Sequence, residues 1–168
     1  MIGILDYGMG NVGSIQNMLK KVGAPCRIVH TAAEVADSDK LILPGVGAFD
    51  AGMTALDESG MRGELDRAAA DGKPVLGICL GMQMLGLGSE EGELAGLGYI
   101  QFHSVRFRLE QQPALKVPHM GWDEVTLADR DDALPHGLDE RPRFYFVHSY
   151  HAVCENDADV LMRCEYGY

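Results

Sequence analysis

The chain has 168 residues, enough for one domain with a single sizeable core, which we expect to span residues 1–168. Apolar residues make up 46% and charged residues 23%, values that are typical of a globular protein and exclude a disordered one. The net charge of −11 would repel nucleic-acid backbones and anionic lipid surfaces, so we expect neither nucleic acid nor a membrane as a partner.

The sequence carries no signal for export, membrane insertion or metal binding. Residues 1–6 include no basic leader, and the longest uncharged stretch, 74–89, is shorter than the roughly 20 apolar residues that span a bilayer. The four cysteines are widely spaced and form no CxxC pair: Cys26, Cys79, Cys154 and Cys164. We therefore expect a cytoplasmic protein without a cofactor, a metal site or a disulfide framework.

The first half of the chain alternates short apolar runs with segments of helical periodicity. The runs typical of buried strands are residues 1–5, 26–30, 41–43 and 75–78. The segments with helical spacing are residues 12–22, 51–56 and 63–70. Strands that alternate with helices in this way predict a parallel sheet with helices on both faces.

The second half is rich in strands. Runs of β-branched and aromatic residues occur at 105–109, 125–127, 144–148, 151–154 and 160–166. No repeat or linker separates them from the first half, so we expect one α/β domain with a mixed, mostly parallel central sheet. Only Gly167 and Tyr168 follow the last run, where a hairpin should continue, so we expect the C-terminal strands to be incomplete.

A glycine-rich segment follows the first predicted strand. Gly8, Gly10 and Gly13 form a GxGxxG pattern between a strand and a helix, as in dinucleotide-binding folds. That interpretation requires an acidic residue at the end of the second strand, which instead ends His30-Thr31. The pattern therefore favours a tight strand-to-helix turn, and a nucleotide-binding protein stays open as an alternative.

A second glycine pattern surrounds Cys79. The sequence Gly77-Ile-Cys79-Leu-Gly81 joins a predicted strand to a helical run, which predicts a nucleophile elbow with sulfur in place of oxygen. On such a sharp turn, the residues two positions before and after the nucleophile lie so close to neighbouring chain segments that both must be glycine. The N–H groups at the start of the helix favour a negative sulfur, and the Leu80 N–H points to where an oxyanion would form.

A third glycine pattern, Pro44-Gly45-Val-Gly47, follows the third predicted strand. Glycines in such a loop let the main chain approach a ligand and present N–H groups to it, although ordinary turn chemistry needs them too. Neighbouring parallel strands bring their following loops to the same edge of the sheet. We therefore expect this loop to lie beside Cys79.

A cysteine nucleophile needs a base, and the histidines are the candidates. His103 follows the helix after Cys79, whereas His148 and His151 are three positions apart in strand-like sequence and so face opposite sides. No pair has the spacing of a metal site, and no histidine is followed by x-Glu or x-Asp. These patterns favour surface or structural histidines.

Five segments of the sequence form a recognisable set in chain order: Asp6-Tyr-Gly-Met-Gly-Asn11, Pro44-Gly-Val-Gly-Ala-Phe49, Gly77-Ile-Cys-Leu-Gly-Met-Gln83, Val117-Pro-His-Met-Gly-Trp122 and Tyr145-Phe-Val-His-Ser-Tyr150. Together they resemble class I glutamine amidotransferases, and among them the glutaminase subunits of imidazole glycerol phosphate synthases. The resemblance covers essentially the whole chain and implies a flavodoxin-like α/β fold.

The resemblance also implies a reaction and its residues. Cys79 would attack the side-chain amide of glutamine, form a glutamyl thioester and release ammonia, and hydrolysis would then release glutamate. Gly47 and Leu80 would supply the oxyanion N–H groups. The glutamine pocket would be lined by Gly45, Gln83, Ser149 and Tyr150.

The partner implied by the resemblance is a (β/α)₈ barrel cyclase, which would receive the ammonia in a heterodimer and form imidazole glycerol phosphate in histidine biosynthesis. The residues that match partner-facing positions are Asn11, Met120 and Trp122. The phosphorylated substrate would bind to the partner, in agreement with the negative charge of this chain.

The sequence departs from the family pattern in one respect. Family members carry a later His-Pro-Glu stretch that supplies the histidine and glutamate of the catalytic triad, and the Gln101-Phe-His103 segment lies too early to match it. We therefore expect the C-terminal segment to be absent here and residues 1–168 alone to be a poor glutaminase. A non-catalytic, partner-binding subunit and a paralogous amidotransferase that serves another synthase stay open as alternatives.

Overall fold

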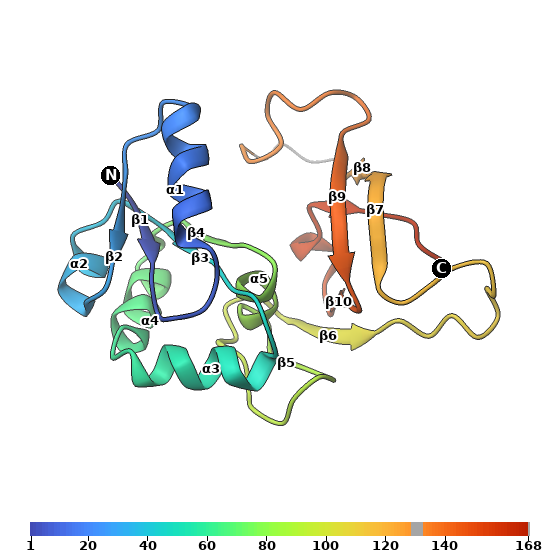
Figure 1. The fold of residues 1–168 in the computed structure, drawn as a ribbon, viewed down its shortest axis with the longest axis horizontal. Coiled ribbons are helices and arrows are strands. Elements are labelled where there is room, and N and C mark those ends of the chain that lie inside the picture. The colour runs from blue at the N-terminus through green and yellow to red at the C-terminus, as the bar shows by residue number, and fades with distance from the viewer. Residues whose placement is uncertain (129–132, 168) are drawn as a thin grey trace.

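The computed structural model describes residues 1–128 and 133–167. Its first half is a parallel α/β unit (Figure 1). The four strands are β1 (Ile2–Leu5), β2 (Cys26–Val29), β3 (Lys40–Leu43) and β4 (Val75–Gly77), which lie side by side in the order β2-β1-β3-β4. Each agrees with its predicted range to within one residue at either end, and all neighbours are parallel.

Five helices accompany this sheet: α1 (Val12–Lys21), α2 (Ala32–Ala36), α3 (Phe49–Glu58), α4 (Arg62–Ala70) and α5 (Leu80–Met84). Alternate residues of a strand face opposite sides. Leu5, Leu41 and Leu43 belong to the buried core cluster together with residues of α2 to α5. Helix α1 contributes no residue to that cluster and packs on β1 and β2, so it covers the other face, as expected.

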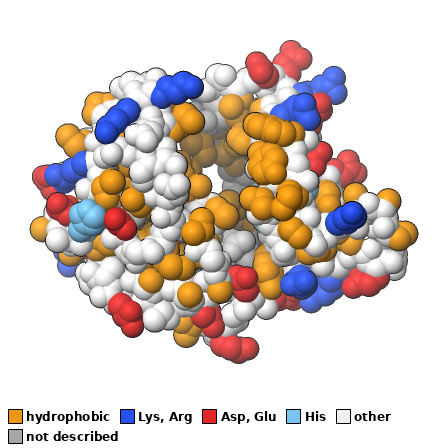
Figure 2. All heavy atoms as spheres, in the orientation of Figure 1, with side chains coloured by type: hydrophobic (Ala, Val, Ile, Leu, Met, Phe, Trp, Pro, Cys, Tyr) orange, Lys and Arg blue, Asp and Glu red, His pale blue; other side chains and the backbone are white. Residues whose placement is uncertain are grey.

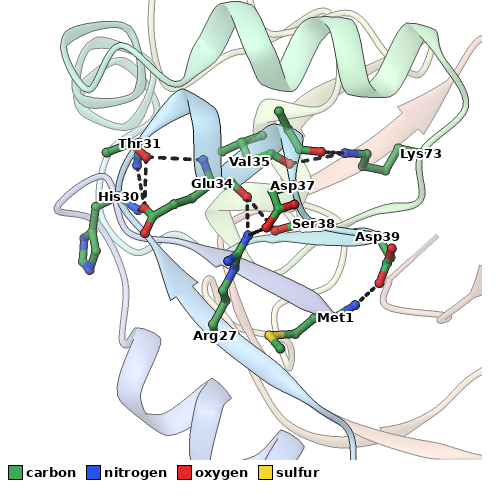
Figure 3. A network of polar contacts seen from close by, with 11 residues as sticks. Met1, Arg27, His30, Thr31, Glu34, Val35, Asp37, Ser38, Asp39 and Lys73 are labelled. Atoms are coloured by element: carbon green, nitrogen blue, oxygen red, sulfur yellow. Dashed lines mark hydrogen bonds and ion pairs between the residues drawn. The ribbon is translucent and has the colours of Figure 1, made fainter.

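Helix α2 was not anticipated, although its capping signal is visible in the sequence. The Thr31 hydroxyl accepts from the Glu34 N–H, and the Glu34 carboxylate accepts from the Thr31 N–H, a capping box that stabilises the first turn (Figure 3). At the other end Lys73 donates to the carbonyl of Ala36 at 2.8 Å. A helix of five residues is too short for its periodicity to be recognised.

The second half consists of small sheets. Strand β6 (Phe102–Arg106) pairs in parallel with β5 (Gly88–Ser89) and antiparallel with β10 (Tyr150–Cys154). Strands β7 (His119–Glu124) and β9 (Arg143–His148) form an antiparallel ribbon, and β8 (Thr126–Leu127) pairs with β11 (Met162–Arg163). A single 3₁₀ turn, η1 (Asp157–Asp159), is described between β10 and β11. The expected mixed, mostly parallel α/β architecture is confirmed, but its strands are divided among separate sheets.

Three predicted strands in the second half need correction. The run 105–109 overlaps a strand that begins earlier, at Phe102, and ends at Arg106; the Phe107 side chain is buried and its N–H donates to Ser149 O. The run 160–166 pairs only at Met162–Arg163, and Tyr168 lies outside the described residues. The run 125–127 contains β8, whereas the longer strand β7 before it was missed.

A hollow separates α1 and the parallel sheet from the β7–β9 ribbon (Figure 2). Hydrophobic side chains gather over β9, on the side of the hollow opposite to α1. Within the described ranges, no helix has the length and apolar character needed to cross a bilayer.

Candidate active site

Cys79 lies at a sharp turn between β4 and α5. Its backbone has φ 56° and ψ −117°, and among the described residues it is the single non-glycine residue with positive φ. The side chain is exposed. A Cβ on Gly77 would lie 2.5 Å from Met82 Cα, and one on Gly81 would lie 1.9 Å from Leu43 O. The two flanking glycines are therefore required by contact, as a nucleophile elbow demands.

The loop after β3 packs directly on this turn. A Cβ on Gly45 would lie 2.8 Å from Gly81 N and 2.9 Å from Leu80 Cβ, so the two chain segments are in backbone contact. Gly47, two residues on, is exposed and has φ +109°, a conformation that favours glycine. The expected proximity of the Gly45–Gly47 loop to the Cys79 turn is thus observed.

The glycine-rich turn after β1 supports that loop from the other side. A Cβ on Gly10 would lie 3.2 Å from Pro44 Cβ and 3.3 Å from Gly45 N. The Asn11 side chain accepts from Ser14 N at 3.0 Å and so caps α1. Gly8 and Gly10 both have positive φ, and Gly10 also approaches the next loop closely, which agrees with the tight-turn interpretation.

Tyr7 fixes the Pro44 carbonyl from within the core. The buried Tyr7 hydroxyl donates to Pro44 O and lies 3.6 Å from Met84 Sδ of α5. Burial raises the pKa of Tyr7 to about 12, so the hydroxyl stays protonated and remains a donor at ordinary pH. Sequence reasoning missed this residue because a tyrosine next to a glycine-rich turn carries no motif of its own.

A pair of acidic residues clasps the segment after Gly47 to the loop after β5. The Glu91 carboxylate accepts from Phe49 N at 3.0 Å, at the start of α3, where Ala48 offers no side-chain cap. In return, the Asp50 carboxylate accepts from the N–H groups of Glu93 and Leu94, each at 3.0 Å. The two loops are therefore held as one unit.

The predicted pocket residues Ser149 and Tyr150 lie at the turn between β9 and β10, and both are half-buried. Tyr150 pairs with Arg106, whose guanidinium carbon lies 5.8 Å from the centre of the Tyr150 ring. The Arg106 N–H donates to the Glu90 carboxylate at 2.9 Å. Because Glu90 adjoins Glu91, this chain of contacts joins the turn to the clasped loops. Gln83, in α5, is half-buried and donates its N–H to Cys79 O.

The residues expected at a partner interface are all exposed. Met120 and Trp122 are 61% and 59% exposed on one face of β7, beside Tyr145 and Val147 of β9. Trp122 and Tyr145 form an edge-to-face pair with ring centres 5.8 Å apart. Asn11 belongs to the other half of the molecule, at the start of α1.

A buried histidine in β7 escaped the sequence analysis. His119 lies in hydrogen-bonding distance of both His148 and Asp123, with Cys164 close by. The 2.6 Å between His119 Nε2 and Asp123 Oδ2 is a hydrogen-bond distance, too short for two ligands of one metal ion, so these two side chains are directly hydrogen-bonded. His103 is exposed on β6. The strand β7 was missed because its residues 119–124 lack regular alternation of apolar and polar types, and His119 was missed with it.

Comparison with known proteins places these motifs in a family. The family model for glutamine amidotransferase class-I matches residues 3–167. The chain is 49% identical to the imidazole glycerol phosphate synthase subunit HisH 2 of Pseudomonas aeruginosa over 168 residues, and 48% identical to the subunit of the same name in Methanococcus maripaludis. It covers 82% and 81% of those two relatives, and 99% of this chain is matched in each.

Solved structures agree on the fold. A glutamine amidotransferase crystal structure superposes with a TM-score of 0.69 at 19% identity, covering 96% of this chain and 79% of the other. The crystal structure of a putative GMP synthase component from Thermoplasma acidophilum superposes with a TM-score of 0.62 at 20% identity, covering 93% of this chain and 68% of the other.

Proposed function

Because the chain belongs to the class I glutamine amidotransferase family, we propose that it is the glutaminase subunit of an imidazole glycerol phosphate synthase. In this role it hydrolyses glutamine in the cytoplasm and passes ammonia to a (β/α)₈ barrel cyclase in histidine biosynthesis. The observation that carries the proposal is the strained, exposed Cys79 between two glycines that contact their surroundings too closely to be replaced.

The reaction begins at the Cys79 sulfur. The thiolate adds to the amide carbon of the glutamine side chain, and the carbonyl oxygen becomes an oxyanion. When the oxyanion collapses, the nitrogen takes up the proton that the thiol gave to the general base, the C–N bond breaks and ammonia leaves, which yields a glutamyl thioester. Water then hydrolyses the thioester to glutamate and restores the thiol.

The oxyanion is stabilised by two main-chain N–H groups. Leu80 N–H lies at the first turn of α5, and Gly47 N–H lies in the loop that packs on the Cys79 turn. Within the described residues, neither N–H donates a hydrogen bond to another group, so both are available to a ligand. Such donors typically contribute about 3 kcal/mol each to transition-state stability.

The glutamine substrate lies between the elbow and the strand-rich half. Gly45 and Gln83 contribute from the loop after β3 and from α5, whereas Ser149 and Tyr150 contribute from the β9–β10 turn. The contacts of Glu90 and Glu91 support this grouping, because they join the turn to the segment that follows Gly47.

The cyclase binds the exposed face that carries Met120 and Trp122, together with Asn11. A contiguous set of exposed aromatic and aliphatic side chains is typical of an interaction surface. The general base is a histidine in the family's His-x-Glu motif, which does not occur in residues 1–168.

The proposal is tested in the complex of the natural full-length protein with the barrel subunit encoded in the same genome. Formation of glutamate from glutamine is compared for the wild type and Cys79→Ala, and the ammonia-dependent cyclase reaction serves as the control. We expect Cys79→Ala to abolish glutamate formation and to leave the ammonia-dependent reaction unchanged.

Two outcomes separate the alternatives. A complex that forms but releases no glutamate in the wild type would indicate a non-catalytic binding subunit. Glutaminase activity that responds to another synthase, and not to the cyclase, would indicate a paralogous amidotransferase.

A further inference from the structure

A line of hydrogen-bonding groups runs through the strand-rich half and ends at the turn between β9 and β10. His119 of β7 is only 1% exposed. Its Nε2 lies 2.6 Å from Asp123 Oδ2 and its Nδ1 lies 3.1 Å from His148 Nε2. The remaining ring nitrogen, His148 Nδ1, lies 2.8 Å from Tyr150 O. All four ring nitrogens therefore have a partner.

The Tyr150 carbonyl fixes the direction of these bonds, because a carbonyl oxygen can only accept. His148 must carry a proton on Nδ1. Burial lowers the pKa of His148, and the neighbouring His119 lowers it further, which favours the neutral ring. A neutral ring protonated on Nδ1 has a lone pair on Nε2, so His148 accepts from the Nδ1–H of His119.

The same reasoning assigns the charge of His119. Its Nδ1 donates to His148, and its Nε2 faces a carboxylate, which accepts. Both nitrogens therefore carry protons, and His119 is a buried imidazolium paired with Asp123.

The surroundings of His119 favour this cation. The ring lies between Tyr166 and Phe146, with centroids 3.8 Å and 4.6 Å away and interplanar angles of 18° and 16°. The faces of aromatic rings attract cations. Cys164 also lies close to the pair, and burial raises its pKa, so it stays a neutral thiol.

We propose that His119 and His148 are positioning residues for the glutamine pocket, because the proton held on His119 keeps His148 as a donor to Tyr150 O. The Ser149 carbonyl is held separately by Phe107 N at 3.1 Å, so both carbonyls of the turn are fixed from neighbouring elements. This inference rests on the proposed function, which places Ser149 and Tyr150 against glutamine.

Two substitutions at His148 test the positioning role in the full-length complex with its cyclase. His148→Asn retains a donor at the position of Nδ1, whereas His148→Leu removes it. We expect His148→Leu to raise KM for glutamine about tenfold, which corresponds to the loss of one buried hydrogen bond, and to change kcat less than about threefold. His148→Asn should stay within about threefold of the wild-type KM. The matched control is His103→Asn, on the exposed side of β6, which should match the wild type.

Two kinetic results would overturn the positioning role. One is a His148→Leu variant whose KM stays within about twofold of the wild type. The other is a His148→Asn variant impaired as strongly as His148→Leu.

The protonation states are tested without any reaction. In protein labelled with ¹⁵N at histidine, ring resonances at pH 7 should show His119 protonated on both nitrogens and His148 protonated on Nδ1 alone. Asp123→Asn should remove the charge of His119, whereas Glu124→Gln, on the next residue and the opposite face of β7, should leave it unchanged. A neutral His119 in the wild type would overturn the inference.

The carbonyl ¹³C resonance of Tyr150 separates this inference from the proposed function. It should shift in His148→Leu and not in His148→Asn, whether or not the protein hydrolyses glutamine. A wild-type complex without glutaminase activity would refute the proposed function, and a Tyr150 resonance that is the same in all variants would refute the positioning role.

Discussion

Gly81 Cα and the carbonyl oxygen of Leu43 are packed so closely that no side chain fits between them. The helix that follows the nucleophile turn thus begins against the end of β3, and the Gly45–Gly47 loop begins at the same point. This contact, together with that of Gly45 on Gly81, sets the spacing between the nucleophile and the candidate oxyanion loop.

Gly81→Ala should disrupt this contact. Its Cβ would lie 1.9 Å from Leu43 O, a collision with backbone that α5 can relieve only by moving. We expect a loss of about 3 kcal/mol in the free energy of unfolding, measured by urea titration. The control is Gly63→Ala in the first turn of α4, where nothing lies within 4 Å of the new Cβ. This variant should gain up to about 1 kcal/mol in the free energy of unfolding. Equal stability of the two variants would contradict the close contact.

Cys79 should be the cysteine that iodoacetamide modifies first. It is exposed at a helix N-terminus, whereas Cys154 and Cys164 are half-buried thiols whose pKa values are raised by burial. We expect Cys79 to react at least about tenfold faster at pH 7.5, with labelled peptides quantified by mass spectrometry. Raising the pH should speed the reaction of Cys154 and Cys164, because more of each thiol then ionises. Equal labelling of all four cysteines in the folded protein would contradict an accessible nucleophile.

Tyr7→Phe should loosen the loop after β3 without removing any group from the candidate site. The change leaves the carbonyl of Pro44 without its buried donor, and we expect it to cost about 1–2 kcal/mol of stability. Tyr145→Phe, at a tyrosine that is 55% exposed, is the control and should change stability by less than about 0.5 kcal/mol. If the two variants are equally stable, the Tyr7 hydrogen bond contributes nothing.

The stabilisation that His151 contributes should fall between pH 7.5 and pH 5.5. Burial lowers the pKa of His151 in the folded state, so the unfolded chain binds more protons at this residue as the pH drops through about 6.5. The stabilisation is thus present above the unfolded pKa and is lost on acidification. We expect the urea midpoint of the wild type to fall relative to that of His151→Asn in this window. Equal changes of midpoint in the two proteins would contradict a lowered pKa of His151.

The parallel half of the fold follows from local sequence. The four strands are short, mainly apolar runs that contain or adjoin a glycine or a proline, and three of the five helices have clear periodicity, so their positions were predictable. The elbow was also predictable, because the requirement for Gly77 and Gly81 is a property of the turn itself.

The strand-rich half depends on contacts between distant residues. Strand β7 is stabilised by its pairing with β9, and His119 has hydrogen-bonding partners in both strands. A short segment of sequence therefore predicts neither the strand nor the partners of His119. The clasp between Asp50 and the loop after β5 is equally non-local, since its partners are more than 40 residues apart. Tertiary pairing, and not propensity, decides such features.

The positive φ of Cys79 has a consequence for how the chain tolerates change. A side chain in that conformation typically costs about 1–3 kcal/mol, and glycine adopts it freely. Cys79→Gly should therefore yield an inactive protein that melts at a higher temperature than the wild type. At position 79 the wild-type residue would then lower conformational stability while it provides the nucleophile. In the absence of selection for activity, substitutions by glycine there should give a more stable but inactive protein.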